Sequence, residues 1–147
     1  MMEVFNEQYV QYIDQEHVSW KSMIQMAGQP LLNDGLIAQE YIDEIITTCE
    51  EKGPYMNIGP NIVLAHARPL PSTKKAVMAL LLSKQPAALL DDQAHKARLW
   101  IFLATPDDRS HIELIQKLAT LLMDADHVQR ILAATSQEEL LASVLAK

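Results

Sequence analysis

Three short apolar runs in the middle of the chain constrain its fold more than any other feature. They cover residues 61–65, 75–82 and 97–103, and polar residues, glycine or proline bound each of them. Near-continuous hydrophobicity is typical of strands that are covered on both faces. Periodicity does not distinguish the second run from a buried helix. Because the run is short, a strand is predicted. A further short strand is predicted at residues 9–13.

Helical patterns precede these strands. Ser19 is a suitable N-cap, and apolar residues follow it at helical spacing. Gly28 is predicted to end this helix, because Pro30 comes close behind it. A second amphipathic helix is predicted over residues 38–51, and the Gly-Pro pair at 53–54 ends it.

The last third of the chain is also predicted to be helical. Residues 110–113 fit a capping box, in which Ser110 starts a helix. A shorter helix is predicted at 126–134, and a second capping box at 136–139 leads into the final helix. Helices on both sides of a strand-rich centre predict one α/β domain over residues 1–147, with a mixed β-sheet flanked by helices on both faces.

Composition narrows the class of protein. The 147 residues carry a formal net charge of −7, and only 12 lysines and arginines are scattered among them. This pattern does not favour binding to nucleic acid or to an anionic membrane surface. Cys49 is the only cysteine and fits a buried helical position, which favours a reducing compartment. The longest apolar run, at residues 76–82, is too short to span a bilayer, so we expect a cytoplasmic protein.

His66 is the strongest candidate for chemistry. It directly follows a predicted buried strand, and strand ends are where α/β folds place their sites. A neutral imidazole has one nitrogen lone pair that can attack an electrophile. Arg68, two residues later, could donate to the oxygens of a phosphoryl group. The structural alternative is a histidine that only bonds a backbone group at the strand end.

His111 is the second candidate. It falls in the first turn of a predicted helix, where free amides and the helix dipole favour anions and disfavour a cationic imidazole. Asp107 and Asp108 lie just upstream and could orient the imidazole ring. The structural alternative is an exposed residue of the first turn.

The other histidines, His17, His95 and His127, lie in polar stretches and are predicted to be exposed. A zinc site built from His66, His95 and His111 has no spacing signature, so no metal ligand is assigned. The chain also lacks glycine-rich phosphate loops, and no nucleotide or other cofactor is expected.

Several segments together resemble one family. Residues 53–55 (Gly-Pro-Tyr), 58–60 (Ile-Gly-Pro) and 64–69 (Leu-Ala-His-Ala-Arg-Pro) resemble the active-site stretch of the type-2 enzyme IIA (EIIA) domains of the sugar phosphotransferase system (PTS). This is the fructose–mannitol–ascorbate superfamily. Further similar segments follow in the same order along the chain: 29–42, 103–113 and 135–141. The resemblance therefore covers nearly the whole chain.

The resemblance implies a phosphocarrier. His66 would accept a phosphoryl group on the ring nitrogen far from the backbone, from the phosphocarrier protein HPr. It would pass the group to a cysteine of a cognate enzyme IIB (EIIB), and through it to the membrane enzyme IIC, for carbohydrate uptake. His111 would help to hold the phosphate, with Arg68 and the helix start at Ser110, and with Asp107 in support. Because the partners are proteins, an apolar rim around His66 is expected from Leu64, Ala67, Leu70 and Pro71.

Two residues depart from the family pattern. Ala65 stands where proline commonly precedes the active histidine, and Glu50 stands where mannitol-type domains have an arginine. Arg68 is the nearest substitute cation, and the overall pattern is most similar to the ascorbate-type subgroup. A regulatory or binding module remains the alternative, with His66 phosphorylation serving as a signal or being absent. A metal hydrolase is a third interpretation, which would require bound zinc.

Overall fold

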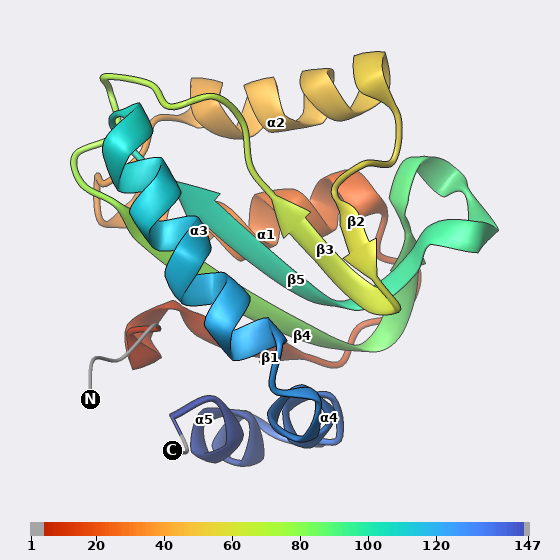
Figure 1. The fold of residues 1–147 in the computed structure, drawn as a ribbon. Helices are drawn as coiled ribbons and strands as arrows, with labels where there is room; N and C mark the ends of the chain where they lie inside the picture. Colours follow the sequence, from red (N-terminus) through yellow and green to blue (C-terminus); the bar gives the residue numbers. More distant parts are fainter. Residues whose placement is uncertain (1–4, 146–147) are drawn as a thin grey trace.

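The computed structural model describes residues 5–145 (Figure 1). Within this range, five strands and five α-helices form a single domain, and none of the helices has the length and apolar character that a bilayer crossing requires. In chain order the elements are β1 (Val10–Ile13), α1 (Trp20–Asn33), α2 (Gln39–Lys52), β2 (Asn57–Gly59), β3 (Asn61–Ala65), β4 (Val77–Ala88), β5 (Lys96–Ala104), α3 (Asp108–Leu122), α4 (Ala125–Leu132) and α5 (Gln137–Leu145).

The five strands form one mixed sheet in the order β1-β4-β5-β3-β2. β1 is parallel to β4 and β3 is parallel to β5, whereas the other two pairs are antiparallel. The predicted mixed sheet is therefore confirmed. The sequence missed β2, which has only three residues. It also ended β4 too early, because this strand continues after a register shift between Leu82 and Ala87.

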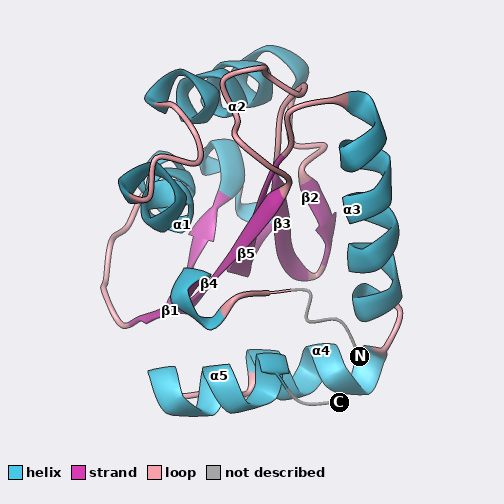
Figure 2. Ribbon diagram, turned by 90° about the vertical axis from the view of Figure 1, so that its left-hand side faces the viewer, coloured by secondary structure: helices cyan, strands magenta, loops and turns pink. Residues whose placement is uncertain are grey.

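Helices cover both faces of the sheet, as predicted. Trp100 and Phe102 of β5 belong to a core with α1 and α2, whereas Leu99 and Ile101 belong to a second core with α3, α4 and α5. Alternate residues of one strand point to opposite faces, so an uninterrupted apolar strand supplies both cores. Figure 2 shows α1 and α2 on one side of the sheet and α3 on the other.

The prediction that Gly28 ends the first helix is wrong, because α1 runs through both Gly28 and Pro30. A Cβ atom at Gly28 would lie 2.6 Å from the ring of Phe102, so glycine lets the helix pack directly on the sheet. Pro30 has no amide to donate to the carbonyl of Met26. The side-chain amide of Gln11 donates to that carbonyl at 2.8 Å instead. Contacts from β5 and β1 thus offset two helix-breaking residues.

A side chain of α5 covers the outer edge of β1. The side-chain oxygen of Gln137 accepts from the amide of Tyr12 at 2.7 Å, and its nitrogen donates to the carbonyl of Val10 at 2.8 Å. An uncovered edge strand can pair with other chains. Gln137 therefore satisfies backbone groups that would otherwise invite association.

The C-terminal helices lie where they were predicted, but the predicted exposure of one histidine is wrong. The amide of Glu139 donates to the hydroxyl of Ser136 at 3.1 Å, which confirms one half of the second capping box. The carboxylate of Glu139 accepts from the amide and the hydroxyl of Thr135 at 2.9 Å, and not from the amide of Ser136. His127 was predicted to be exposed, but it is buried, and its Nε2 donates to the carbonyl of Ser143 at 2.6 Å. The polar neighbours of His127 did not reveal that this side of α4 packs against α5.

Candidate active site

His66 and His111 come together because the strands before them are parallel. β3 and β5 pair with Ala65 opposite Phe102, so both strands end at the same edge of the sheet. His66 directly follows β3, and the helix that carries His111 begins shortly after β5. The two ring centroids are 6.1 Å apart, with the ring planes at 41°.

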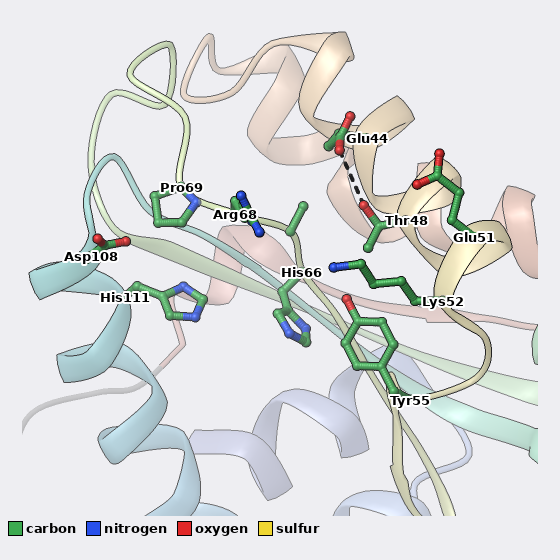
Figure 3. A pocket seen from close by; sticks show the side chains of 11 residues that line it. Glu44, Thr48, Glu51, Lys52, Tyr55, His66, Arg68, Pro69, Asp108 and His111 are labelled. Carbon is green, nitrogen blue, oxygen red and sulfur yellow. Dashed lines mark hydrogen bonds between the residues drawn. The ribbon is translucent and has the colours of Figure 1, made fainter.

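Both histidines line a pocket of about 420 Å³ between α2, the start of α3 and the loop after β3. Figure 3 shows the side chains around it. The other charged residues of the lining are Glu44, Glu51, Lys52, Arg68 and Asp108. The pocket therefore combines two imidazoles with side chains of both charges.

The ring of His66 is held in one tautomer. Its Nδ1 lies 2.8 Å from the carbonyl oxygen of Leu64. A carbonyl oxygen only accepts, so Nδ1 carries the proton and Nε2 of the neutral ring holds the lone pair. Burial lowers the pKa of His66, the bond to Leu64 opposes this shift, and the charge on His111 adds to it. His66 is therefore neutral near pH 7, with Nε2 as its nucleophilic atom.

The start of α3 differs from the predicted capping box. Asp107 is the N-cap, and its carboxylate accepts from the amide of Ser110 at 2.8 Å and from its hydroxyl at 2.9 Å. The carboxylate of Glu113 accepts from Arg109 instead of a helix-start amide. Ser110 is therefore not the N-cap, because the upstream aspartate takes that position. The amide and the hydroxyl of Ser110 therefore both donate to Asp107, whose carboxylate lies at the start of the helix.

Thr105 contacts the ring of His111. Its hydroxyl lies 3.4 Å from Nδ1 of His111, and the threonine is fully buried directly after β5. This contact on Nδ1 leaves Nε2 as the ring nitrogen available to a group in the pocket. No role was predicted for Thr105. Its hydroxyl comes just after a predicted strand, a position that could have marked it as a site residue.

Two tyrosines were also missed. The ring of Tyr55 stands edge-on to His66, with centroids 5.8 Å apart and an interplanar angle of 84°. The buried hydroxyl of Tyr41 bonds backbone groups of Ala67 and Leu103, beside the ends of β3 and β5. Both lie in segments that resembled the family, Tyr55 in Gly-Pro-Tyr and Tyr41 in residues 29–42, but no role was predicted for either.

Two cations line the pocket. Arg68 was predicted, but Lys52 was missed, although it directly precedes the Gly-Pro pair that ends α2 beside the site. Across residues 5–145, neither cation has a carboxylate oxygen within 4.0 Å. Glu50 lies outside the pocket lining, and it pairs with Lys21 at 3.2 Å.

Only part of the predicted apolar rim is exposed, since Pro71 is exposed and Leu70 is half-buried. Leu64 and Ala67 are only 6% and 5% exposed, because they pack into the cores on the two faces of the sheet. The large apolar side chains that are exposed in this region belong to other segments. Tyr55 and Ile58 are each 45% exposed around β2, and Ile112 is 58% exposed on α3.

The remaining histidines lie outside this pocket. His17 is exposed, as predicted. His95 was predicted to be solvated, but it is half-buried, and its Nδ1 lies 2.7 Å from the side-chain oxygen of Asn57. His95 precedes β5, whereas His111 follows that strand, so His66, His95 and His111 do not meet in one site. Within the described part of the chain, no group of three or more His, Cys, Asp or Glu side chains is arranged to hold a metal ion.

The sequence matches one family along almost its whole length. Residues 3–147 match the family described as "Phosphoenolpyruvate-dependent sugar phosphotransferase system, EIIA 2". The chain is 31% identical over 121 residues to the mannitol-specific cryptic phosphotransferase enzyme IIA component of Escherichia coli K12, covering 82% of each protein. It is 25% identical over 127 residues to the ascorbate-specific PTS system EIIA component of the same strain, covering 86% of this chain and 82% of that protein.

Solved structures show the same fold. The solution structure of the mannitol-specific cryptic enzyme IIA of Escherichia coli has a TM-score of 0.84 at 28% identity, covering 97% of this chain and 98% of that one. Enzyme IIA for mannitol, solved in complex with phosphorylated enzyme IIB from Escherichia coli, has a TM-score of 0.74 at 18% identity, covering 97% and 98%. The chain belongs to the type-2 EIIA family of the phosphoenolpyruvate-dependent sugar phosphotransferase system, whose members are phosphotransferases.

Proposed function

We propose that this protein is a cytoplasmic phosphocarrier in which His66 accepts a phosphoryl group from phospho-HPr and passes it to a cysteine of a cognate EIIB. The observation that carries the proposal is the tautomer of His66. Its Nδ1 donates to the carbonyl of Leu64 at 2.8 Å, which leaves Nε2 as a nucleophile in a pocket with two cations.

The first transfer begins with the lone pair on Nε2 of neutral His66. It forms a bond to the phosphorus atom while the bond from phosphorus to the donor imidazole of HPr breaks, and that imidazole keeps the electron pair. The Nδ1 proton stays on His66, so the phosphorylated ring is cationic. The carbonyl of Leu64 stabilises this cation through the hydrogen bond that it already accepts.

The second transfer reverses these roles. A thiolate of EIIB attacks the phosphorus atom, a sulfur–phosphorus bond forms, and Nε2 of His66 recovers its electron pair as the nitrogen–phosphorus bond breaks. No metal or nucleotide takes part in the proposed steps, because the donor is already a phosphoprotein. The group would then reach the sugar through EIIC in the membrane.

Arg68 and His111 are proposed to hold the phosphoryl oxygens. Both line the pocket with His66, and the contact with Thr105 leaves Nε2 of His111 available as a donor. Asp107 acts one step away, since it caps the helix that carries His111 and its carboxylate accepts from the amide and the hydroxyl of Ser110. Charged donors that meet developing negative charge are a main source of catalysis in phosphoryl transfer.

The proposed protein partner and the proposed class of sugar are inferred from related proteins. A related mannitol enzyme IIA forms a complex with phosphorylated enzyme IIB, which supports an EIIB as the acceptor. The relatives act on mannitol and on ascorbate, and identity to the mannitol-specific one is higher. We therefore propose a carbohydrate substrate, and the ascorbate-type subgroup remains a sequence prediction.

The test is incubation with enzyme I, HPr and ³²P-labelled phosphoenolpyruvate. Wild type and His17→Ala, which changes an exposed histidine outside the pocket, should both take up label, and His66→Ala should take up none. Label that survives His66→Ala, or a wild type without label, contradicts the proposal. Label on His66 that no EIIB removes supports a regulatory module instead.

A further inference from the structure

The end of α2 delivers a lysine into the pocket of His66. Lys52 is the last residue of the helix, and Gly53 follows it with φ of 93°, a conformation that L side chains rarely adopt. The helix therefore stops at Lys52, and the chain turns toward Tyr55. Figure 3 shows the amine of Lys52 directed into the space between Thr48 and the ring of His66.

The charges around this space leave Lys52 available. Glu50 is ion-paired with Lys21 at 3.2 Å, and Glu44 accepts from the hydroxyl of Thr48 at 3.4 Å. No carboxylate oxygen in residues 5–145 lies within 4.0 Å of the Lys52 amine. Within the described part of the chain, its three N–H donors are therefore free for a group that enters the pocket.

The pocket needs this cation once His66 is phosphorylated. Its lining holds the three carboxylates of Glu44, Glu51 and Asp108 and only two side-chain cations, Lys52 and Arg68. The C-terminal end of α2 adds partial negative charge. These carboxylates and this helix end oppose a dianionic phosphoryl group on His66, and a cation that contacts the group directly would offset them.

We propose that Lys52 is a phosphate-binding residue that contacts the phosphoryl oxygens on the α2 side of His66, while Arg68 approaches from the loop after β3. The inference rests on the proposed function of His66. A lysine suits this place because its ammonium is a compact charge on a flexible stem, able to follow the phosphoryl group as it arrives and leaves.

Lys52 also has a purely structural interpretation, because a cation at a helix C-terminus stabilises the helix dipole. If that were its only role, replacing Lys52 would slightly lower the stability of the fold and would leave the titration of the phosphoryl group unchanged. The two interpretations are separated by measuring the phosphoryl group itself.

The test compares Lys52→Gln, Lys52→Arg and the control Lys96→Gln, which changes an exposed lysine outside the pocket lining. Each variant receives label from phospho-HPr, and ³¹P NMR follows the titration of the phosphoryl group on His66. Lys52→Gln should take up label at least about tenfold more slowly, and its ³¹P midpoint should move to higher pH because the dianion loses a cation. Lys52→Arg should restore most of the rate, and Lys96→Gln should match wild type.

The outcomes separate the inference from the proposed function. If wild type carries label on His66 and Lys52→Gln matches Lys96→Gln in rate and midpoint, only the role of Lys52 is overturned. Slow labelling with an unchanged midpoint and no rescue by Lys52→Arg indicates a structural effect, and it also overturns that role. A wild type without label on His66 overturns the proposed function and this inference together.

Discussion

The hydroxyl of Tyr41 accepts a hydrogen bond from the amide of Ala67 at 3.1 Å, one residue beyond His66. The same hydroxyl donates to the carbonyl of Leu103 at 2.7 Å, near the end of β5. Burial raises the pKa of Tyr41 to about 12, so the hydroxyl stays protonated at neutral pH. Through this side chain α2 joins the two strand ends that carry the site. The link is made at Ala67, two residues beyond Ala65, which is the last residue of β3.

Tyr41→Phe should lower the free energy of unfolding by about 1–3 kcal/mol, because a buried amide and a buried carbonyl lose their partner. Urea unfolding measures this loss. Tyr9→Phe is a matched control, because it removes an exposed hydroxyl that donates to Asp34 at 2.8 Å, and it should cost less. Equal losses in the two variants would contradict the proposed link.

The protonation of His66 should depend on pH in a defined direction. Its pKa is lowered, chiefly by burial, so its ring should stay neutral and nucleophilic below the usual histidine value of about 6.5. ¹⁵N NMR of the ring measures both the midpoint and the tautomer, which should be the one with a proton on Nδ1. The unfolded chain binds this proton at higher pH than the folded chain, so acidification through this range should also reduce stability. A midpoint at or above 6.5 contradicts the expectation.

His111→Ala should slow phosphorylation of His66 by about 10- to 100-fold, as expected for the loss of a charge-assisted hydrogen bond. The ring is half-exposed at the pocket, so the fold should remain intact by circular dichroism. Thr105→Val should cause a smaller loss by releasing Nδ1 of His111. Thr120→Val, which changes an exposed hydroxyl on α3, serves as the control. A His111→Ala variant that is unfolded would show that His111 is structural.

Arg68→Ala should slow phosphorylation more than Arg109→Ala does. Arg68 lines the pocket, whereas Arg109 is exposed on α3 and only pairs with Glu113 at 3.4 Å. Initial rates of label transfer from phospho-HPr measure the difference. Arg98 is not a suitable control, because it donates to two backbone carbonyls and its loss should destabilise the fold. Equal rates for Arg68→Ala and Arg109→Ala would remove Arg68 from the proposed site.

Gly28→Ala should destabilise the protein by about 1–3 kcal/mol, as overpacking does in tight cores. The new methyl group would lie 2.6 Å from the ring of Phe102, and this clash should outweigh the better helix propensity of alanine. Gly59→Ala is the control, because a Cβ there meets no atom within 4 Å. Thermal unfolding compares the two variants, and an equally stable Gly28→Ala would show that α1 can move away from the sheet without cost.

Local pattern was sufficient for most of the elements. The run at residues 61–65 is β3, and the run at 97–103 is most of β5. Both were predictable because a strand buried on two faces needs apolar side chains at successive positions. The position of His66 after a strand was predictable for the same local reason. The resemblance implied that His111 helps to hold a phosphate on His66, but the parallel pairing of β3 and β5 that brings the two rings together is known only from the fold.

The cations of the pocket show where local pattern fails. Glu50 and Lys52 are two residues apart on one helix, and each residue turns the helix by about 100°. Packing of α2 on the sheet decides which of them faces His66, and it turns Lys52 toward the pocket and Glu50 toward Lys21. The sequence of the helix alone does not show which of the two residues faces the pocket.

The sequence by itself determined four of the five strands, most of the helices and the histidine that follows β3, because these depend on residues within a few positions of one another. Tertiary structure decided the rest. α1 continues past Gly28 because the ring of Phe102, distant in the chain, occupies the space of a Cβ atom. His127 is buried because α4 packs against α5, and its ring bonds Ser143. Such contacts depend on which elements become neighbours in space, and that information is distributed over the whole chain.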